Sequence, residues 1–254
     1  MKFEEIAETV KGIPFIDLGN ARYLYDLIIR EKLTRILELG IGHGTATCYM
    51  AAALDELGEG RITSVDLLDA VSWFKPSAEY QLEKANLAYL VQILRMQTGY
   101  SWFLHDEIRW LTIDDVCRPE YDLCVIDGPK NWTIDGGAFF LVDKVLKQNG
   151  WIIFDDYLWT YAESSSTQTD GITHRELSEP ERNTPQIREV FELLVKQHPN
   201  YSEFVVHPDG NWAIARKIAS DRKTYSMKYE TSLAGVLIGA MVRIRHSLRR
   251  ILHA

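Results

Sequence analysis

The chain has 254 residues, of which 46% are hydrophobic, so it can bury a substantial core and is not a collagen-like, coiled-coil or disordered protein. Its formal net charge is −8, and residues 221–254 contribute +5 from seven Lys/Arg and two Asp/Glu, which leaves −13 for residues 1–220. An acidic body of this kind repels a phosphate backbone, so we expect a small-molecule substrate and no nucleic-acid partner.

Membrane spans, disulfides and zinc are not expected. The longest apolar run, Leu233–Val242, has ten residues, against the roughly 20 that span a bilayer. The N-terminus is acidic where a signal peptide is basic, and the three cysteines lack CxxC or Cys/His spacing. These features predict a cytoplasmic protein.

Short β-rich runs alternate with helical stretches, which predicts an α/β fold with a parallel sheet covered by helices on both faces. Residues 1–30 predict one or two helices. Beyond them we predict strands at 35–40, 61–67, 121–128 and 150–156, a weaker strand at 101–106, helices at 45–57 and 136–147, and a hairpin at 201–218. The hairpin adds an antiparallel strand at the end of the sheet.

This pattern divides the chain into a helical cap (1–30), an α/β domain (31–219) and a tail (220–254). Residues 160–185 are polar and rich in Ser and Thr, and they predict either a lid or a loop without contacts. The tail has four arginines within Leu233–Leu252 and predicts a basic amphipathic helix. Packing on the chain's own body or on a second subunit of a homo-oligomer is favoured over docking on an anionic membrane, and RNA is least favoured.

A glycine-rich segment, residues 38–44 with the sequence ELGIGHG, follows the first predicted strand and opens a helix. Closely spaced glycines allow the backbone to turn tightly and to approach a ligand at a helix N-terminus. The dinucleotide pattern GxGxxG would place its third glycine one residue later, and the lysine of GxxxxGK[ST] is missing. The spacing therefore disfavours a pyrophosphate ligand, and an NAD-binding oxidoreductase is kept as an alternative.

The pattern ExGxGxG resembles the first motif of class I S-adenosylmethionine-dependent methyltransferases, and the resemblance extends over about residues 30–218. It implies a Rossmann-like fold with a seven-stranded, mostly parallel sheet that ends in an antiparallel strand. The resemblance implies that S-adenosylmethionine is bound by Glu38, Gly40, Gly42 and Gly44, and that its ribose hydroxyls are bound by Asp66 at the end of the second predicted strand. Adjacent strand ends flank the ligand crevice of such sheets, which supports this place for Asp66. Asp106, at the end of the weak strand, is a candidate for the adenine amino group.

Three carboxylates follow the next two predicted strands, namely Asp127 after one and Asp155 and Asp156 after the other. Neighbouring parallel strands bring them to one edge of the sheet, where they repel one another unless a cation is shared or protons are taken up. A hard divalent ion with oxygen ligands, such as Mg²⁺, resolves this conflict. It would bind adjacent hydroxyls of a substrate and lower the pKa of the one to be methylated.

This arrangement resembles the metal-dependent O-methyltransferases, both the catechol type and the type that acts on sugars of macrolide and aminocoumarin antibiotics. Lys130 follows Asp127 at the interval between metal aspartate and catalytic lysine in the catechol type, so the resemblance implies a general base there. That base requires a lowered pKa. Asp156 stands where the catechol type usually has Asn, which is closer to the sugar-modifying type, whose base is often His or Asp. His174 and His105 are therefore alternatives.

The aromatic residues Trp132, Tyr157 and Trp159 lie near the same edge and either form a floor for the substrate or pack in the core. Together these features predict a methyltransferase that uses S-adenosylmethionine and a divalent cation to methylate an oxygen of a small substrate. A sugar, a catechol-like ring and another natural-product hydroxyl all fit. A methyltransferase-like scaffold that binds a partner is the non-enzymatic alternative.

Overall fold

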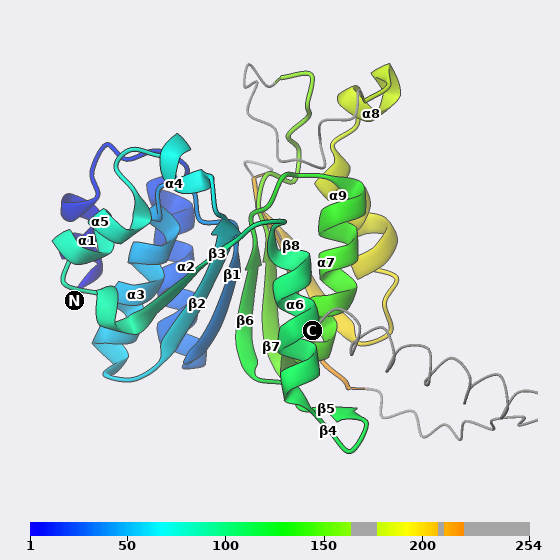
Figure 1. The fold of residues 1–254 in the computed structure, drawn as a ribbon, viewed down its shortest axis with the longest axis horizontal. Coiled ribbons are helices and arrows are strands. Elements are labelled where there is room, and N and C mark those ends of the chain that lie inside the picture. Colours follow the sequence, from blue (N-terminus) through cyan, green and yellow to red (C-terminus); the bar gives the residue numbers. More distant parts are fainter. Residues whose placement is uncertain (164–176, 208–210, 221–254) are drawn as a thin grey trace, which may run out of the picture. The chain divides into compact units, whose positions relative to one another are not determined.

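The computed structural model describes residues 1–163, 177–207 and 211–220, which belong to one compact unit, Met1–Ser220 (Figure 1). Its centre is a seven-stranded sheet with the order β3-β2-β1-β6-β7-β9-β8. The strands are β1 (Arg35–Leu39), β2 (Arg61–Leu67), β3 (Val91–Met96), β6 (Tyr121–Ile126), β7 (Leu146–Phe154), β8 (Tyr201–Val206) and β9 (Ala213–Lys217). Pairing from β3 to β7 is parallel, and β9 runs antiparallel to both neighbours. The predicted Rossmann-like α/β fold is confirmed.

Helices cover both faces of the sheet (Figure 1). One core contains residues of α1 (Phe3–Thr9), α2 (Leu18–Glu31) and α3 (Thr45–Leu57). The other contains residues of α6 (Tyr100–Leu111), α7 (Trp132–Val145) and α9 (Gln186–Val190). The remaining elements are α4 (Ala70–Trp73), α5 (Ala78–Lys84), η1 (Ala88–Leu90), the hairpin β4 (Thr112–Ile113) and β5 (Val116–Cys117), α8 (Glu179–Asn183) and η2 (Phe191–Val195). No helix among the described residues is long and apolar enough to cross a membrane.

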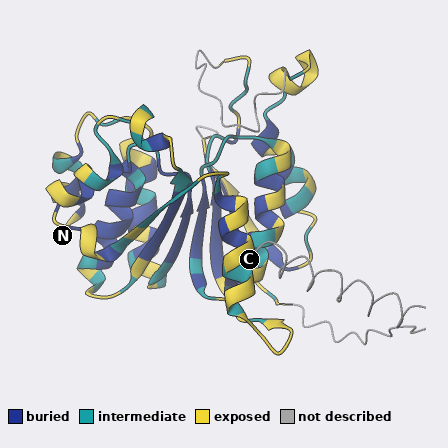
Figure 2. Cartoon of the chain, viewed as in Figure 1, coloured by how far each residue is buried: buried dark blue, intermediate teal, exposed yellow. Residues whose placement is uncertain are grey.

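The central strands are buried on both faces, as their continuous apolar runs predict (Figure 2). In β1, Ile36 faces the core under α2 and α3, and Leu37 faces the core under α6 and α7. Ile153 and Ile152 divide between the same two cores in β7. Alternation within a strand therefore places successive side chains in different cores.

Side-chain caps fix the starts of α2 and α7. The Asp17 carboxylate accepts the N–H groups of Gly19 and Asn20 at the start of α2, at 2.7 and 3.0 Å. At the start of α7, the Asn131 side-chain oxygen accepts the N–H groups of Thr133 and Ile134, at 2.9 and 3.2 Å. Such caps satisfy backbone donors that the helix itself leaves unpaired.

The predicted weak strand at 101–106 is wrong. This segment lies in α6, where Phe103 and Leu104 point into the core and Trp102 is exposed. The three consecutive apolar residues belong to a helical pattern, which continues through the partly buried Ile108. The third strand of the parallel part of the sheet is β3, which the sequence analysis missed.

The predicted helix at 136–147 has shifted boundaries. Helix α7 spans Trp132–Val145, and β7 begins at once with Leu146. The Asn149-Gly150 pair therefore lies inside the strand, where Asn149 has φ +67°. The pairing between β6 and β7 shifts register in the same region, so this pair marks a strand irregularity rather than a helix end.

Candidate active site

The glycine-rich segment forms the turn between β1 and α3, and Gly40, Gly42 and Gly44 all have positive φ, at 97°, 57° and 75°. A Cβ atom on Gly40 would lie 2.0 Å from the backbone oxygen of Asp127. On Gly44 it would lie 2.5 Å from the Cβ of Ala78. Conformation and contact thus both require glycine, and the turn lies directly against the segment that follows β6.

Asp66 lies beside this turn at the end of β2, where the sequence predicted it. Its Oδ2 atom accepts the N–H groups of Ile41 and Gly42, at 3.1 and 3.2 Å. The Nη1 atom of Arg95 on β3 lies 3.5 Å from the same oxygen. The hydrogen bonds from the turn orient the Asp66 carboxylate. The Asp66 side chain is 14% exposed, so it remains accessible to a ligand. The ribose role stays a prediction.

Glu38 lies beneath the turn and is 2% exposed. Its carboxylate accepts hydrogen bonds from Thr47 on α3 at 2.8 Å and from Ser64 on β2 at 2.6 Å. Burial raises the pKa of Glu38 to about 7, against the lowering effect of these two hydroxyls. The side chain thus links β1, β2 and α3 in the interior, and binding of the cofactor by Glu38 stays a prediction.

Asp106 and His105 lie in a helix and not, as was predicted, at the end of a strand. Both lie on the outer side of α6, with 58% and 47% of their side chains exposed, and they bond each other at 2.9 Å. His105 also stacks on Trp102, with ring centroids 4.3 Å apart. Because the strand at 101–106 does not exist, the placement on which the adenine role of Asp106 depended is wrong. His105 lies on the same exposed part of α6, and its role as an alternative base stays a prediction.

The three predicted acidic residues meet at the ends of β6 and β7, around the ammonium group of Lys130. Lys130 Nζ donates to Asp127 Oδ1 in a short hydrogen bond and lies 3.4 Å from Asp155 Oδ2 and 3.5 Å from Asp156 Oδ2. The Lys130 side chain is 11% exposed and its backbone has φ +62°. We call these four residues the acidic cluster.

Electrostatics of the acidic cluster favour a protonated lysine. Burial works against the charge of Lys130, but the charges of Asp127, Asp155 and Asp156 outweigh it and raise the pKa of Lys130 well above its usual value. Burial raises the pKa values of Asp127 and Asp156, and the negative charge of Asp155 raises them further. Lys130 can therefore act as a base only after it has left these carboxylates.

The donors of the acidic cluster suit a hard cation, since three carboxylate oxygens from three residues converge on one point. That point is held by the Lys130 ammonium group. As they stand, the described residues contain no group of three His, Cys, Asp or Glu side chains arranged to hold a metal ion. The chemistry of the donor set thus fits a divalent ion, on the condition that Lys130 moves aside.

A buried pair that the sequence analysis missed holds the loop carrying Asp127 and Lys130. Asp135 on α7 is fully buried, accepts a short hydrogen bond from the Tyr100 hydroxyl, and accepts the N–H of Asn131 at 2.7 Å. A Cβ atom on Gly128 would lie 2.1 Å from the Tyr100 oxygen. The pair therefore packs directly under the loop.

Of the predicted aromatic floor, only part lies beside the acidic cluster. Tyr157 is 8% exposed, packs in the core and donates to Glu192 at 2.8 Å. Trp159 packs edge-on against Tyr161, with centroids 4.9 Å apart. The Tyr161 hydroxyl donates to the Pro129 oxygen at 2.5 Å, so this pair is joined to the loop of Lys130.

Several predicted features lie outside the described residues. These are His174, the central part of the lid (164–176) and the tail from residue 221. Their roles as base, lid, and oligomer or membrane contact stay predictions.

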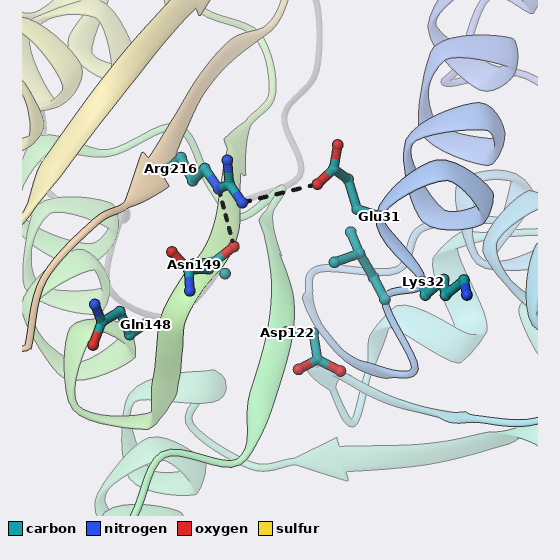
Figure 3. A pocket seen from close by; sticks show the side chains of 8 residues that line it. Glu31, Lys32, Asp122, Gln148, Asn149 and Arg216 are labelled. Carbon is teal, nitrogen blue, oxygen red and sulfur yellow. Dashed lines mark hydrogen bonds and ion pairs between the residues drawn. The ribbon is translucent and has the colours of Figure 1, made fainter.

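A pocket at the opposite end of the strands contains none of the predicted site residues (Figure 3). It is lined by residues of the turn after α2 and by Asp122, Asn149 and Arg216. Arg216 donates to the Asn149 oxygen at 3.3 Å and lies 3.9 Å from Glu31. Arg216 thus interacts with two of the other lining residues. Because the pocket contains none of the predicted site residues, we do not consider it a candidate active site.

Comparison with known proteins gives a family match, and residues 37–157 match the model of a methyltransferase domain. Solved structures share the fold at low identity. One assigned as a caffeoyl-CoA O-methyltransferase, from Staphylococcus aureus, has 20% identity and a TM-score of 0.58, covering 85% of this chain and 92% of that one. An O-methyltransferase from Bacillus cereus in complex with S-adenosylhomocysteine has 18% identity and a TM-score of 0.57, with coverage of 85% and 90%.

A third structure, an O-methyltransferase of tomaymycin synthesis from Streptomyces achromogenes in complex with S-adenosylmethionine, has 17% identity and a TM-score of 0.55. It covers 85% of this chain and 89% of that one. No curated protein matches the chain. The family match favours methyl transfer over the NAD-binding alternative. Residues 37–157 thus match a methyltransferase-domain family, and the chain shares its fold with the solved O-methyltransferases.

Proposed function

We propose that this protein is an S-adenosylmethionine-dependent methyltransferase that methylates an oxygen of a small hydroxylated substrate, with a divalent cation held by Asp127, Asp155 and Asp156. One observation carries the proposal: the acidic cluster lies in backbone contact with the glycine turn, through Gly40 and the Asp127 oxygen. A methyl donor on the turn and an acceptor at the cluster would therefore be neighbours. The three related structures are named O-methyltransferases, which supports oxygen as the acceptor.

The reaction is an in-line displacement, in which the oxygen–carbon bond forms as the carbon–sulfur bond breaks and the hydroxyl proton leaves. The residues of this chain hold the two reactants in line and exclude other orientations. The carboxylates of Asp127, Asp155 and Asp156 supply the negative charge that attracts a cation. A bound divalent ion would stabilise the deprotonated hydroxyl group of the substrate. Once Lys130 has left the three carboxylates, it is the nearby group that can take the proton.

Calorimetry with S-adenosylhomocysteine and with NAD⁺ tests the cofactor site. We expect binding of the first and none of the second. Asp66→Ala should weaken binding at least tenfold. Asp106→Ala is the matched control, because that exposed carboxylate should leave affinity unchanged. Equal loss in both variants would contradict the assignment of Asp66.

Turnover of radiolabelled S-adenosylmethionine with catechol-like, sugar and phenolic hydroxyl substrates tests the acceptor and the cation. Chelation should abolish transfer and added Mg²⁺ should restore it, while Asp155→Ala should abolish transfer without loss of S-adenosylhomocysteine binding. Transfer that survives both chelation and Asp155→Ala would show that the carboxylates are structural.

A further inference from the structure

Trp212 contacts the acidic cluster from a segment that none of the predicted motifs includes. It is 4% exposed and immediately precedes β9. Its indole Nε1–H donates to Asp155 Oδ1 at 2.7 Å, while Asp155 Oδ2 faces Lys130 Nζ at 3.4 Å. The two oxygens of this carboxylate are thus divided, one toward the indole and one toward the cluster.

The pairing of β7 with β9 brings this contact about. Phe154 pairs with Ala213 in the antiparallel ladder, so the next residues, Asp155 and Trp212, stand opposite each other just beyond it. The N–H of Tyr157 donates to the Asn211 oxygen at 3.0 Å and holds the two segments together past the ladder.

The indole ring is itself held in place. The His207 ring stacks on it, with centroids 5.7 Å apart and an interplanar angle of 27°. The backbone N–H of His207 donates to the backbone oxygen of Trp212 at 2.9 Å. His207 Nδ1 lies 2.6 Å from Oδ1 of Asn20, a residue of α2 that is 4% exposed. Tyr23 meets the His207 ring edge-on at 4.5 Å. Contacts from α2 thus fix the ring whose N–H fixes Asp155.

We propose that Trp212 is a positioning residue for the reaction centre, which acts by holding Asp155 with one oxygen directed at the centre of the acidic cluster. This inference rests on the proposed function, because it assigns a role to Asp155 as a cation ligand. Without the indole bond, the carboxylate is free to rotate and to present either oxygen to Lys130. Partners that orient metal-binding carboxylates change metal affinity by about 10- to 100-fold when they are removed.

The test replaces the N–H and keeps the ring. β-(3-benzothienyl)alanine at position 212 has the shape of tryptophan with sulfur in place of the indole N–H, and Trp212→Phe is a simpler second variant. Trp151→Phe is the matched control, since Trp151 is also buried and its Nε1 has no hydrogen-bond partner. Binding of Mn²⁺ is measured by calorimetry in the presence of S-adenosylhomocysteine.

We expect the Kd for Mn²⁺ to rise about tenfold or more in both position-212 variants and to stay unchanged in Trp151→Phe. Unchanged Mn²⁺ affinity in the benzothienyl variant would overturn the inference. If the wild-type protein binds no Mn²⁺, the cation part of the proposed function fails, and the indole N–H resonance of Trp212 decides the inference. That resonance must then shift with Asp155→Asn and not with Asp156→Asn, and an absence of any shift would overturn it.

Discussion

Replacing Glu38 by Gln should make the stability of this protein less dependent on pH. The Glu38 carboxyl has a pKa of about 7 in the folded state, because burial disfavours its charge, and an ordinary value of 4.5 when exposed. Because the pKa of Glu38 is higher in the folded state than in the unfolded state, its protonation stabilises the fold. This contribution to the free energy of unfolding is fully present below pH 4.5 and is lost as the pH rises through 7. A difference of about 2.5 in pKa corresponds to about 3 kcal/mol.

Glu38→Gln keeps the shape and the two hydroxyl contacts but cannot ionise. The free energy of unfolding, measured with urea between pH 5 and pH 8.5, should be similar for both proteins at pH 5. It should then become greater for the variant by up to about 3 kcal/mol at pH 8.5. Glu8→Gln serves as the control, since that side chain is 74% exposed. Parallel stability curves for wild type and Glu38→Gln would refute the reasoning.

Three further substitutions test the site. Gly40→Ala should destabilise the fold by about 3 kcal/mol or more and abolish S-adenosylhomocysteine binding, because the new Cβ atom would clash with a backbone oxygen. Gly137→Ala on α7 is the control: its new Cβ atom has free space, so urea unfolding and binding should be nearly unchanged. Tyr100→Phe removes a donor from the buried Asp135 and should cost about 1–3 kcal/mol by urea unfolding, with a fall in turnover as the loop of the acidic cluster loosens. Arg95→Gln should weaken S-adenosylhomocysteine binding several-fold in calorimetry, because the carboxylate of β2 loses its cationic neighbour, and unchanged affinity would contradict this role.

The order and type of most elements could be predicted because their signals are local. The helix after the glycine turn was predicted at 45–57 and observed at Thr45–Leu57, since Gly44 opens it and Gly58 closes it in left-handed conformations. The placement of Asp127, Asp155 and Asp156 at one edge followed from the parallel order of β6 and β7. Strand ends in such sheets lie together whatever the loops do.

What could not be predicted depends on tertiary contacts. The strand β3 lies at the edge of the sheet. Five of its six residues are partly buried and Gln92 is exposed, so it lacks the long apolar run of a central strand. Missing it hid Arg95 and misplaced Asp106. Trp212 is 57 residues from its partner Asp155, and only the register of β9 joins them. The raised pKa of Lys130 likewise depends on three charges that meet only in the fold.

Under the proposed function, the absence of a side chain at position 40 also limits where the two reactants can lie. Main-chain atoms of the glycine turn and of Asp127 touch there, so under the proposed function the backbone sets the distance between the methyl donor and the acidic cluster. Enlarging or reshaping the acceptor cannot stretch that spacing. We therefore expect adaptation to bulkier substrates beside this contact, where the Tyr161 hydroxyl donates to the Pro129 oxygen and Trp159 packs on Tyr161.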